Sequence, residues 1–177
     1  MDFRQLLSNK IFILLMAFLV LAVLGIGFYL YQGGQLFPQQ EQKINFESCP
    51  VKGDICLDTK EANDKGVRIG FGHTLPEGTE VYTPVSGEIS FGRASSPNES
   101  YVGVRIADPR GYLITYYFKG TTIAESNFYA PAGTLVGKTA ESINSLGGLN
   151  LVVEIRDQAT GKIILLDAKE ILKNAQK

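Results

Sequence analysis

The sequence contains few of the side chains that bind metal ions and no large excess of charge. One histidine and two cysteines occur in 177 residues. A single histidine excludes a site built from two His ligands of one chain, and two cysteines exclude a four-cysteine zinc site or a disulfide-rich scaffold. The 17 Lys and Arg nearly balance the 18 Asp and Glu, so the basic surface typical of a nucleic-acid-binding protein is absent. We therefore expect neither a nucleic-acid partner nor a cofactor.

A long apolar run lies near the N-terminus. Residues 11–31 read IFILLMAFLVLAVLGIGFYLY and contain no charged side chain. As a helix, this run is about 30 Å long, which matches the hydrocarbon core of a bilayer, and it leaves no polar face for water. A cleaved signal peptide has a shorter apolar stretch of about 7–15 residues and a small-residue cleavage site. The sequence therefore predicts an uncleaved transmembrane helix over residues 11–32.

The charges beside this helix predict its orientation. Arg4 and Lys10 precede it, whereas residues 32–40 carry no charge. Positive side chains stay on the cytoplasmic side of a membrane. We expect residues 1–10 to be cytoplasmic and the rest of the chain after the helix to lie outside. The localisation that follows is a single-pass protein of the inner or plasma membrane.

Residues 33–65 are predicted to form an extracytoplasmic linker, because Gln, Gly and Pro are frequent near its start and no hydrophobic period is evident. Cys49 and Cys56 lie within it. Outside the cytoplasm a disulfide between them is favoured, worth about 2.5 kcal/mol in the chain-entropy model. The alternative is two free thiols without a structural role. The spacing excludes a C-x-x-C redox motif.

Residues 66–177 are predicted to form the folded domain, which we expect to be mainly β. Runs of β-branched and aromatic residues are separated by glycine and proline turns. The clearest runs cover residues 101–106 (YVGVRI), 112–118 (YLITYYF) and 149–156 (LNLVVEIR). Short strands at this spacing are typical of a small β-sandwich or barrel-sandwich. One helix is expected near the C-terminus, where Asp167 and Glu170 form a capping-box pattern, and residues 93–100 are expected to form an exposed loop.

Five short segments follow one another in a fixed order. They are residues 76–82 (PEGTEVY), 101–106 (YVGVRI), 111–116 (GYLITY), 130–137 (APAGTLVG) and 149–156 (LNLVVEIR). Together they resemble the motifs of lysostaphin-type (LytM-like, peptidase family M23) zinc metallopeptidases, and the resemblance spans residues 67–172. It implies the duplicated hybrid-motif β domain of that family and a bacterial envelope protein.

The same resemblance implies a zinc site that this sequence does not supply. The family holds zinc with the His and Asp of an H-x-x-x-D pair and the second His of an H-x-H pair, and further histidines assist catalysis. The aligned positions here are Arg68, Gly72, Phe118, Asn150 and Val152. An arginine cannot ligate zinc and repels a cation. We therefore interpret the domain as a degenerate, non-catalytic pseudoenzyme without a bound metal.

His73 and the former groove are two further features of this region. His73, beside the Gly72 position, is expected to be a surface or turn residue, because the aligned positions offer it no partner ligands. The groove itself is a candidate cleft for a partner, since aromatic and Arg side chains anchor interfaces. The cleft residues are Arg68, Tyr116, Tyr117 and Asn150. The alternative is that Phe118 and Val152 fill the vacated space as core.

The sequence thus predicts an envelope protein that binds protein partners or peptidoglycan, as a regulator of cell-wall hydrolysis or a scaffold of an envelope channel or secretion complex. Its oligomeric state stays open. A first alternative is a membrane-fusion or efflux-adaptor subunit, because residues 80–89 and 130–137 also resemble the paired motifs of lipoyl-type barrel-sandwich domains. Such adaptors need a long helical hairpin, and no helical period of that length is evident. A second alternative, disfavoured by the missing histidines, is an active cell-wall hydrolase.

Overall fold

The computed structural model describes residues 16, 18–21, 44–96, 98–123, 127–173 and 175. The chain forms two compact units, Met1–Gln42 and Lys43–Lys177. In the first unit, Met16 and residues 18–21 are helical. The rest of the predicted transmembrane helix, its flanks and residues 33–43 of the predicted linker lie outside the described residues. Within the described part of the chain, no helix is both long enough and apolar enough to cross a bilayer.

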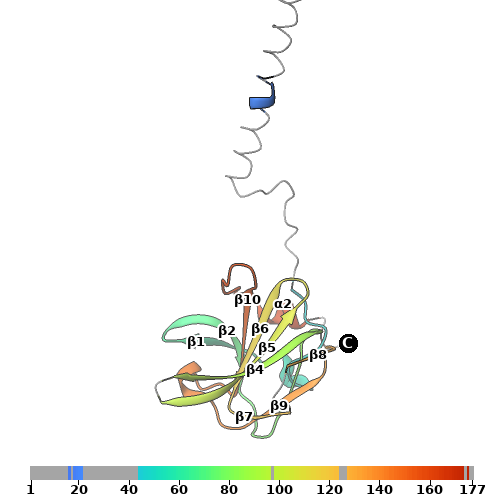
Figure 1. Cartoon of the computed structure of the whole chain (residues 1–177). Helices are drawn as coiled ribbons and strands as arrows, with labels where there is room; N and C mark the ends of the chain where they lie inside the picture. The colour runs from blue at the N-terminus through green and yellow to red at the C-terminus, as the bar shows by residue number, and fades with distance from the viewer. Residues whose placement is uncertain are drawn as a thin grey trace, which may run out of the picture. The chain divides into compact units, whose positions relative to one another are not determined.

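The second unit is mainly β, as the sequence predicts, and its strands pair antiparallel (Figure 1). The larger sheet has the strand order β1-β2-β10-β6-β5-β4-β8, and the smaller sheet has the order β3-β9-β7. The larger sheet is built from β1 (Lys60–Asp64), β2 (Val67–His73), β10 (Leu151–Asp157), β6 (Tyr112–Phe118), β5 (Glu99–Asp108), β4 (Gly87–Ser96) and β8 (Phe128–Ala130). The smaller sheet is built from β3 (Glu80–Tyr82), β9 (Leu135–Thr139) and β7 (Gly120–Thr122). Short helical turns are η1 (Asp54–Leu57) and η2 (Asn144–Leu146), and the helix α2 (Ala168–Leu172) follows β10.

One buried cluster of apolar side chains joins the two sheets. It includes Phe118 of β6, Val81 of β3 and Val136 of β9, none of which has exposed surface. In β10, the alternate residues Leu151, Val153 and Ile155 face this core, because side chains project from opposite faces of a strand in turn. The helix α2 adds Leu172 to the same cluster. Its expected N-cap is present, since a side-chain oxygen of Asp167 accepts the Lys169 N–H at 2.9 Å.

The folded unit begins earlier than the predicted boundary at residue 66. Residues 44–65, predicted as linker, belong to this unit. Ile44, Phe46 and Val51 are buried in the main core, and the Phe46 N–H donates to the Ile171 carbonyl at 3.2 Å. Ile44 and Phe46 alternate with polar residues over too few positions to predict a strand, and Val51 lies between a proline and a lysine. We call residues 44–59 the strap; the structure joins Cys49 and Cys56 within it by a disulfide.

The predicted loop at residues 93–100 is also different in the structure. Strands β4 and β5 pair as a hairpin from Glu88 and Ala107 as far as Ser96 and Glu99. The hairpin end is fixed by the Glu99 carboxylate, which accepts the N–H groups of Asn144 and Ser145 at 3.0 and 2.7 Å. Lys119 Nζ lies 2.9 Å from the same carboxylate. These long-range contacts stabilise a strand end whose local sequence of small polar residues favours a loop.

Candidate functional site

The positions aligned with the zinc ligands identify one face of the larger sheet. Gly72 of β2 pairs with Val152 of β10, Val152 pairs with Tyr117 of β6, and Tyr117 pairs with Gly103 of β5. Cross-strand partners project from the same face of a sheet. These residues therefore form one row. We call this side of the sheet the Tyr117 face, and the opposite side is the core face.

Gly72 is fixed as glycine by its neighbours. A Cβ added there would lie 2.4 Å from the Leu151 carbonyl oxygen and 2.8 Å from a methyl carbon of Leu149. Both distances are far below van der Waals contact. On this backbone the position cannot carry the aspartate that the family resemblance would place there.

The Asn150 side chain is hydrogen-bonded to the backbone of neighbouring loops. Its Oδ1 accepts the Leu75 N–H at 2.9 Å, and its Nδ2 donates to the Ala140 carbonyl at 3.0 Å. The residue is buried, and the hydrogen bond from Leu75 is buried with it. Asn150 therefore joins three segments of the chain, and both polar atoms of its side chain have a structural role.

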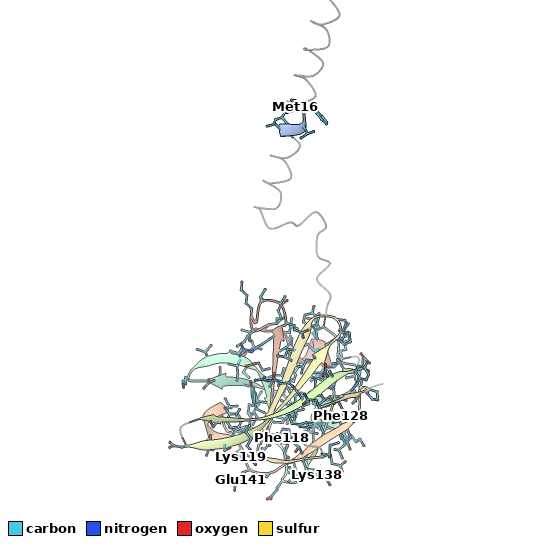
Figure 2. All side chains as sticks on the ribbon, viewed as in Figure 1. Met16, Phe118, Lys119, Phe128, Lys138 and Glu141 are labelled. Atoms are coloured by element: carbon cyan, nitrogen blue, oxygen red, sulfur yellow. A yellow bond between two sulfur atoms is a disulfide. The ribbon has the colours of Figure 1, made fainter. Side chains whose placement is uncertain are left out.

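Val152 and Phe118 lie on opposite faces of the sheet. Val152 is buried with Ile143, Leu146 and Leu149 in a second, smaller hydrophobic cluster. Phe118 pairs with Leu151 instead and belongs to the main core (Figure 2). Both side chains thus fill core space, which is the alternative that the sequence offered to a partner-binding cleft.

The predicted partner cleft is not assembled. Tyr116 faces the main core, without exposed surface, and its hydroxyl donates to the Tyr82 carbonyl at 3.1 Å. Burial raises the pKa of Tyr116 well above its ordinary value. Tyr117, its neighbour in β6, projects from the other face. A surface shared by these two tyrosines is therefore excluded by strand geometry.

Arg68 is engaged at the edge of the larger sheet. Its Nη1 lies 3.1 Å from the Glu61 carboxylate of β1, and its Nη2 donates to the Leu166 carbonyl at 3.4 Å. These contacts join β1, β2 and the segment before α2. Arg68 therefore has a structural environment, and its cation further disfavours a divalent metal nearby.

The residues at the aligned positions do not fit zinc. They offer a glycine, a valine, an arginine, a phenylalanine on the other face and an amide already hydrogen-bonded. In the described ranges, no three His, Cys, Asp or Glu side chains are grouped closely enough to hold a metal ion. Zinc in a catalytic site requires three protein ligands, so we derive no metal-dependent step for this domain.

His73 is fully buried, and the expectation that it lies at the surface or in a turn is wrong. It is the last residue of β2, and the strap covers it: its Nδ1 lies 3.2 Å from the Asp58 carbonyl oxygen. Its ring meets the edge of Phe71 at 6.1 Å between centroids. Nε2 is buried and has no hydrogen-bond partner in the part of the chain that the structure describes. Burial lowers the pKa of His73.

The Tyr117 face carries a feature that the sequence analysis missed. The rings of Tyr101 and Tyr117 meet edge to face, with centroids 5.7 Å apart. The Tyr117 hydroxyl lies 3.5 Å from the Glu154 carboxylate, and burial together with that negative charge raises the pKa of Tyr117 to about 12. Gly103, the cross-strand partner of Tyr117, is buried, and the Tyr117 ring lies about 4.0 Å from where its Cβ would be.

Arg105 completes this surface. It is exposed, it lies two residues from Gly103 on the same face, and its positive charge reaches Tyr117. Among the described residues, no hydrogen bond or ion pair to its guanidinium is found. The sequence signal is the alternation of residues 101–106, in which Tyr101, Gly103 and Arg105 share one face and the apolar residues share the other.

No family model matches the chain, and no curated protein matches it. Thirteen chains of solved structures are similar to it. One is described as the structure of the SpoIIQ–SpoIIIAH pore forming complex, with 12% sequence identity and a TM-score of 0.49, covering 69% of this chain and 89% of that chain. Another is the catalytic domain of the antimicrobial peptidase lysostaphin from Staphylococcus simulans, with 14% identity and a TM-score of 0.44, covering 72% and 83%. At TM-scores below 0.5, neither likeness is evidence of function.

Proposed function

We propose that this chain is a non-catalytic, single-pass envelope protein whose extracytoplasmic LytM-like domain binds a protein partner through the Tyr117 face. The N-terminus is cytoplasmic, and the membrane is the inner or plasma membrane. The domain regulates or scaffolds an envelope process and does not cleave peptide bonds.

Two features of the chain support the anchor and its orientation. Residues 11–31 form an uncharged apolar run, preceded by Arg4 and Lys10 and followed by an uncharged stretch. The disulfide between Cys49 and Cys56 suits an oxidising compartment, because such bonds persist mainly outside the cytoplasm.

The arrangement of the strands supports the LytM-like assignment. The segments that carry the sequence resemblance coincide with strands β3, β5, β6, β9 and β10 and with the turns beside them. Strands β10, β6 and β5 are neighbours in the larger sheet, and β3 and β9 pair in the smaller one. Two antiparallel sheets around one core fit the β-sandwich of a duplicated hybrid motif.

The observation that carries the non-catalytic proposal is the state of Asn150 and Gly72. The Asn150 amide is hydrogen-bonded to the backbone on both sides, and Gly72 has no room for a side chain. Residues around the aligned positions are packed for stability. An active zinc metallopeptidase needs three ligand side chains there and one open coordination position on the metal.

The partner surface is proposed from Tyr101, Tyr117 and Arg105. Tyrosine and arginine are enriched among the residues that dominate interface energies. Because Arg105 is exposed and no ion pair to it is found among the described residues, we expect the partner to present a carboxylate to it.

The enzymatic alternative is tested on the full chain purified in detergent micelles. We expect no stoichiometric zinc by metal analysis after incubation with Zn²⁺, and no release of peptides from purified peptidoglycan. Zinc at one equivalent together with turnover would overturn the non-catalytic proposal.

The partner surface is tested by crosslinking in native membranes with matched charge reversals. Arg105→Glu on the Tyr117 face should abolish a crosslinked species formed by the wild-type chain. Arg93→Glu is the control, because Arg93 is also exposed and lies in the same hairpin. Arg93 pairs with Val102 and therefore projects from the core face, opposite the Tyr117 face. Equal loss in both variants, or binding of the chain to isolated peptidoglycan that Arg105→Glu abolishes, would exclude the proposed protein partner.

A further inference from the structure

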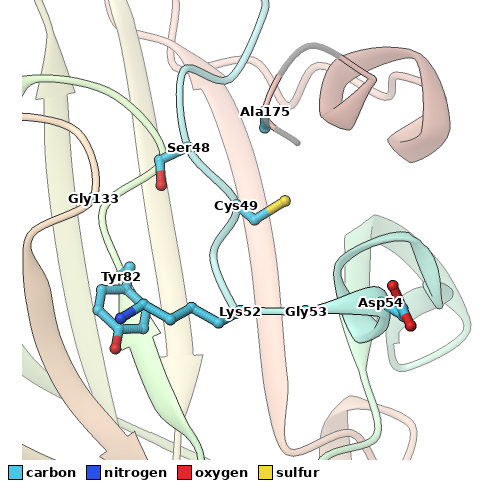
Figure 3. A pocket seen from close by; sticks show the side chains of 8 residues that line it. All are labelled: Ser48, Cys49, Lys52, Gly53, Asp54, Tyr82, Gly133 and Ala175. Atoms are coloured by element: carbon cyan, nitrogen blue, oxygen red, sulfur yellow. The ribbon is translucent and has the colours of Figure 1, made fainter. Parts of the chain in front are cut away.

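The disulfide of the strap is asymmetric. Cys56 has no exposed surface, whereas Cys49 is partly exposed. Cys49 lines an open pocket of about 450 Å³ (Figure 3). Its other lining residues are Ser48, Lys52, Gly53 and Asp54 of the strap, Tyr82 of β3, Gly133 before β9 and Ala175 after α2. Of the two bonded cysteines, Cys49 lines this pocket, and Cys56 is fully buried.

A positive charge is held in the wall of the same pocket. Lys52 is exposed, and its Nζ lies 4.3 Å from the centroid of the Tyr82 ring. This cation–π contact restricts the ammonium group to the pocket side of β3. Lys52 is one of two charged groups in the lining, the other being the Asp54 carboxylate. The attacking species in thiol–disulfide exchange is a thiolate, so the Lys52 ammonium group is the part of the lining that attracts it.

We propose that the Cys49–Cys56 disulfide is a thiol-exchange site, reduced by a dithiol protein that attacks Cys49 from the pocket. The thiolate of the reductant forms a bond to Cys49 Sγ while the bond between Cys49 and Cys56 breaks. The electron pair leaves on Cys56 Sγ, which takes up a proton. The second thiol of the reductant, losing its proton, then attacks the mixed disulfide at the reductant's own sulfur, and Cys49 leaves and is protonated. Two electrons and two protons pass from the dithiol to the chain.

Reduction changes how the strap is held. The loop closed by the disulfide makes a backbone hydrogen bond from the Tyr82 N–H to the Pro50 carbonyl at 2.8 Å. Just after the loop, the Asp58 carbonyl contacts His73. When the disulfide is reduced, the residues of the loop gain conformational freedom, and only these noncovalent contacts then hold them in place. We expect faster hydrogen exchange at the Tyr82 amide in the reduced chain. The site concerns the strap only and does not depend on a partner at the Tyr117 face.

The attacked sulfur is identified with glutathione and the full chain in detergent micelles. Under native conditions, mass spectrometry of the trapped mixed disulfide should place glutathione on Cys49 at least about tenfold more often than on Cys56, because only Cys49 faces the pocket. Equal labelling, preferential labelling of Cys56, or reduction only at the rate of global unfolding would overturn the proposal.

The charge of the pocket is tested with Lys52→Glu. The variant should react about threefold more slowly with glutathione, whose thiolate form is an anion with further negative charge, and at an unchanged rate with neutral β-mercaptoethanol corrected for its thiolate fraction. Lys65→Glu, at an exposed lysine in the turn between β1 and β2, is the matched control. Equal effects of the two substitutions would show that Lys52 has no specific role.

Protein-mediated exchange is tested with a thioredoxin-type dithiol protein whose second cysteine is replaced by serine. It should form a stable mixed disulfide with Cys49 of the wild-type chain. The test uses the wild-type chain, so it does not depend on whether a Cys56→Ser variant folds. Absence of the adduct under conditions in which glutathione reacts would exclude a protein reductant at this pocket.

Discussion

The ring of Phe118 lies directly against the backbone of Gly137. A Cβ added to Gly137 would be 2.7 Å from Cζ of Phe118 and 2.5 Å from the Thr121 carbonyl oxygen. Phe118 belongs to the larger sheet and Gly137 to the smaller one. The residue that the family resemblance aligns with a catalytic histidine is therefore a packing contact between the two sheets.

This contact predicts a large loss of stability in Phe118→Ala. Removing a fully buried phenylalanine costs about 3–5 kcal/mol in the free energy of unfolding. Gly137→Ala should also destabilise the domain, because the new methyl group meets backbone and ring atoms. Urea unfolding followed by circular dichroism measures both. Tyr129→Ala is the control, since Tyr129 is 67% exposed, and a change as large as that of Phe118→Ala would contradict the interpretation.

A second prediction concerns restoration of the family ligands. The variant carrying Arg68→His, Gly72→Asp, Asn150→His and Val152→His should bind no stoichiometric zinc and should unfold more readily than the wild type. The Gly72 position has no space for a Cβ, and Asn150→His loses the hydrogen bonds to Leu75 and Ala140, each worth about 1–3 kcal/mol when a buried partner is left unsatisfied.

The steric part of this prediction is separated by single variants. Gly72→Asp should destabilise the domain, whereas Gly92→Asp should not, because an added Cβ at Gly92 meets nothing within 4 Å. Zinc at one equivalent in the fourfold variant, measured by metal analysis, would show that the backbone adapts.

The sequence predicts the strands of the larger sheet better than its edges. In residues 112–118 and 149–156, apolar, β-branched and aromatic side chains alternate with polar ones or cluster together, and β6 and β10 are found there. The strap and the end of the β4–β5 hairpin are missed because their stability comes from distant contacts. Phe46 is held by the core and by Ile171, and Glu99 is held by Asn144, Ser145 and Lys119. No local pattern reports such contacts.

The candidate site is less predictable still. Alignment to a family shows that ligands are missing, but it does not show which way a side chain points. Tyr116 and Tyr117 are equally aromatic in the sequence, and only the register of β6 assigns one to the core and the other to the Tyr117 face. His73 is buried only because the strap covers it, so the error about His73 follows from the error about the linker.

A third prediction uses the carboxylate of Glu99. Hydrogen bonds from Ser145 and Lys119 lower its pKa from 4.5 to about 2. Since the folded state holds the charged form more strongly than the unfolded state, the stabilisation is complete above pH 4.5 and is lost as the pH falls toward 2. The melting temperature of Glu99→Gln should therefore lie below that of the wild type at pH 7, and the difference should shrink between pH 4.5 and 2. Glu141→Gln, at an 82% exposed carboxylate 3.6 Å from Lys119, should show little difference at any pH.

A fourth prediction uses His73, the one histidine of the chain. Desolvation lowers its pKa below the ordinary value of 6.5 in the folded state, so the unfolded state takes up a proton first as the pH falls. Stability should therefore be constant near pH 7 and should decrease below pH 6.5, by at most about 1.4 kcal/mol per pH unit for one proton. The urea midpoint measured from pH 7.5 to 5 reports this slope. In His73→Phe the slope between pH 6.5 and 5 should disappear, because no other histidine is present to titrate. An unchanged slope in that variant would show that carboxylates, and not the buried imidazole beneath the strap, set the response to mild acid.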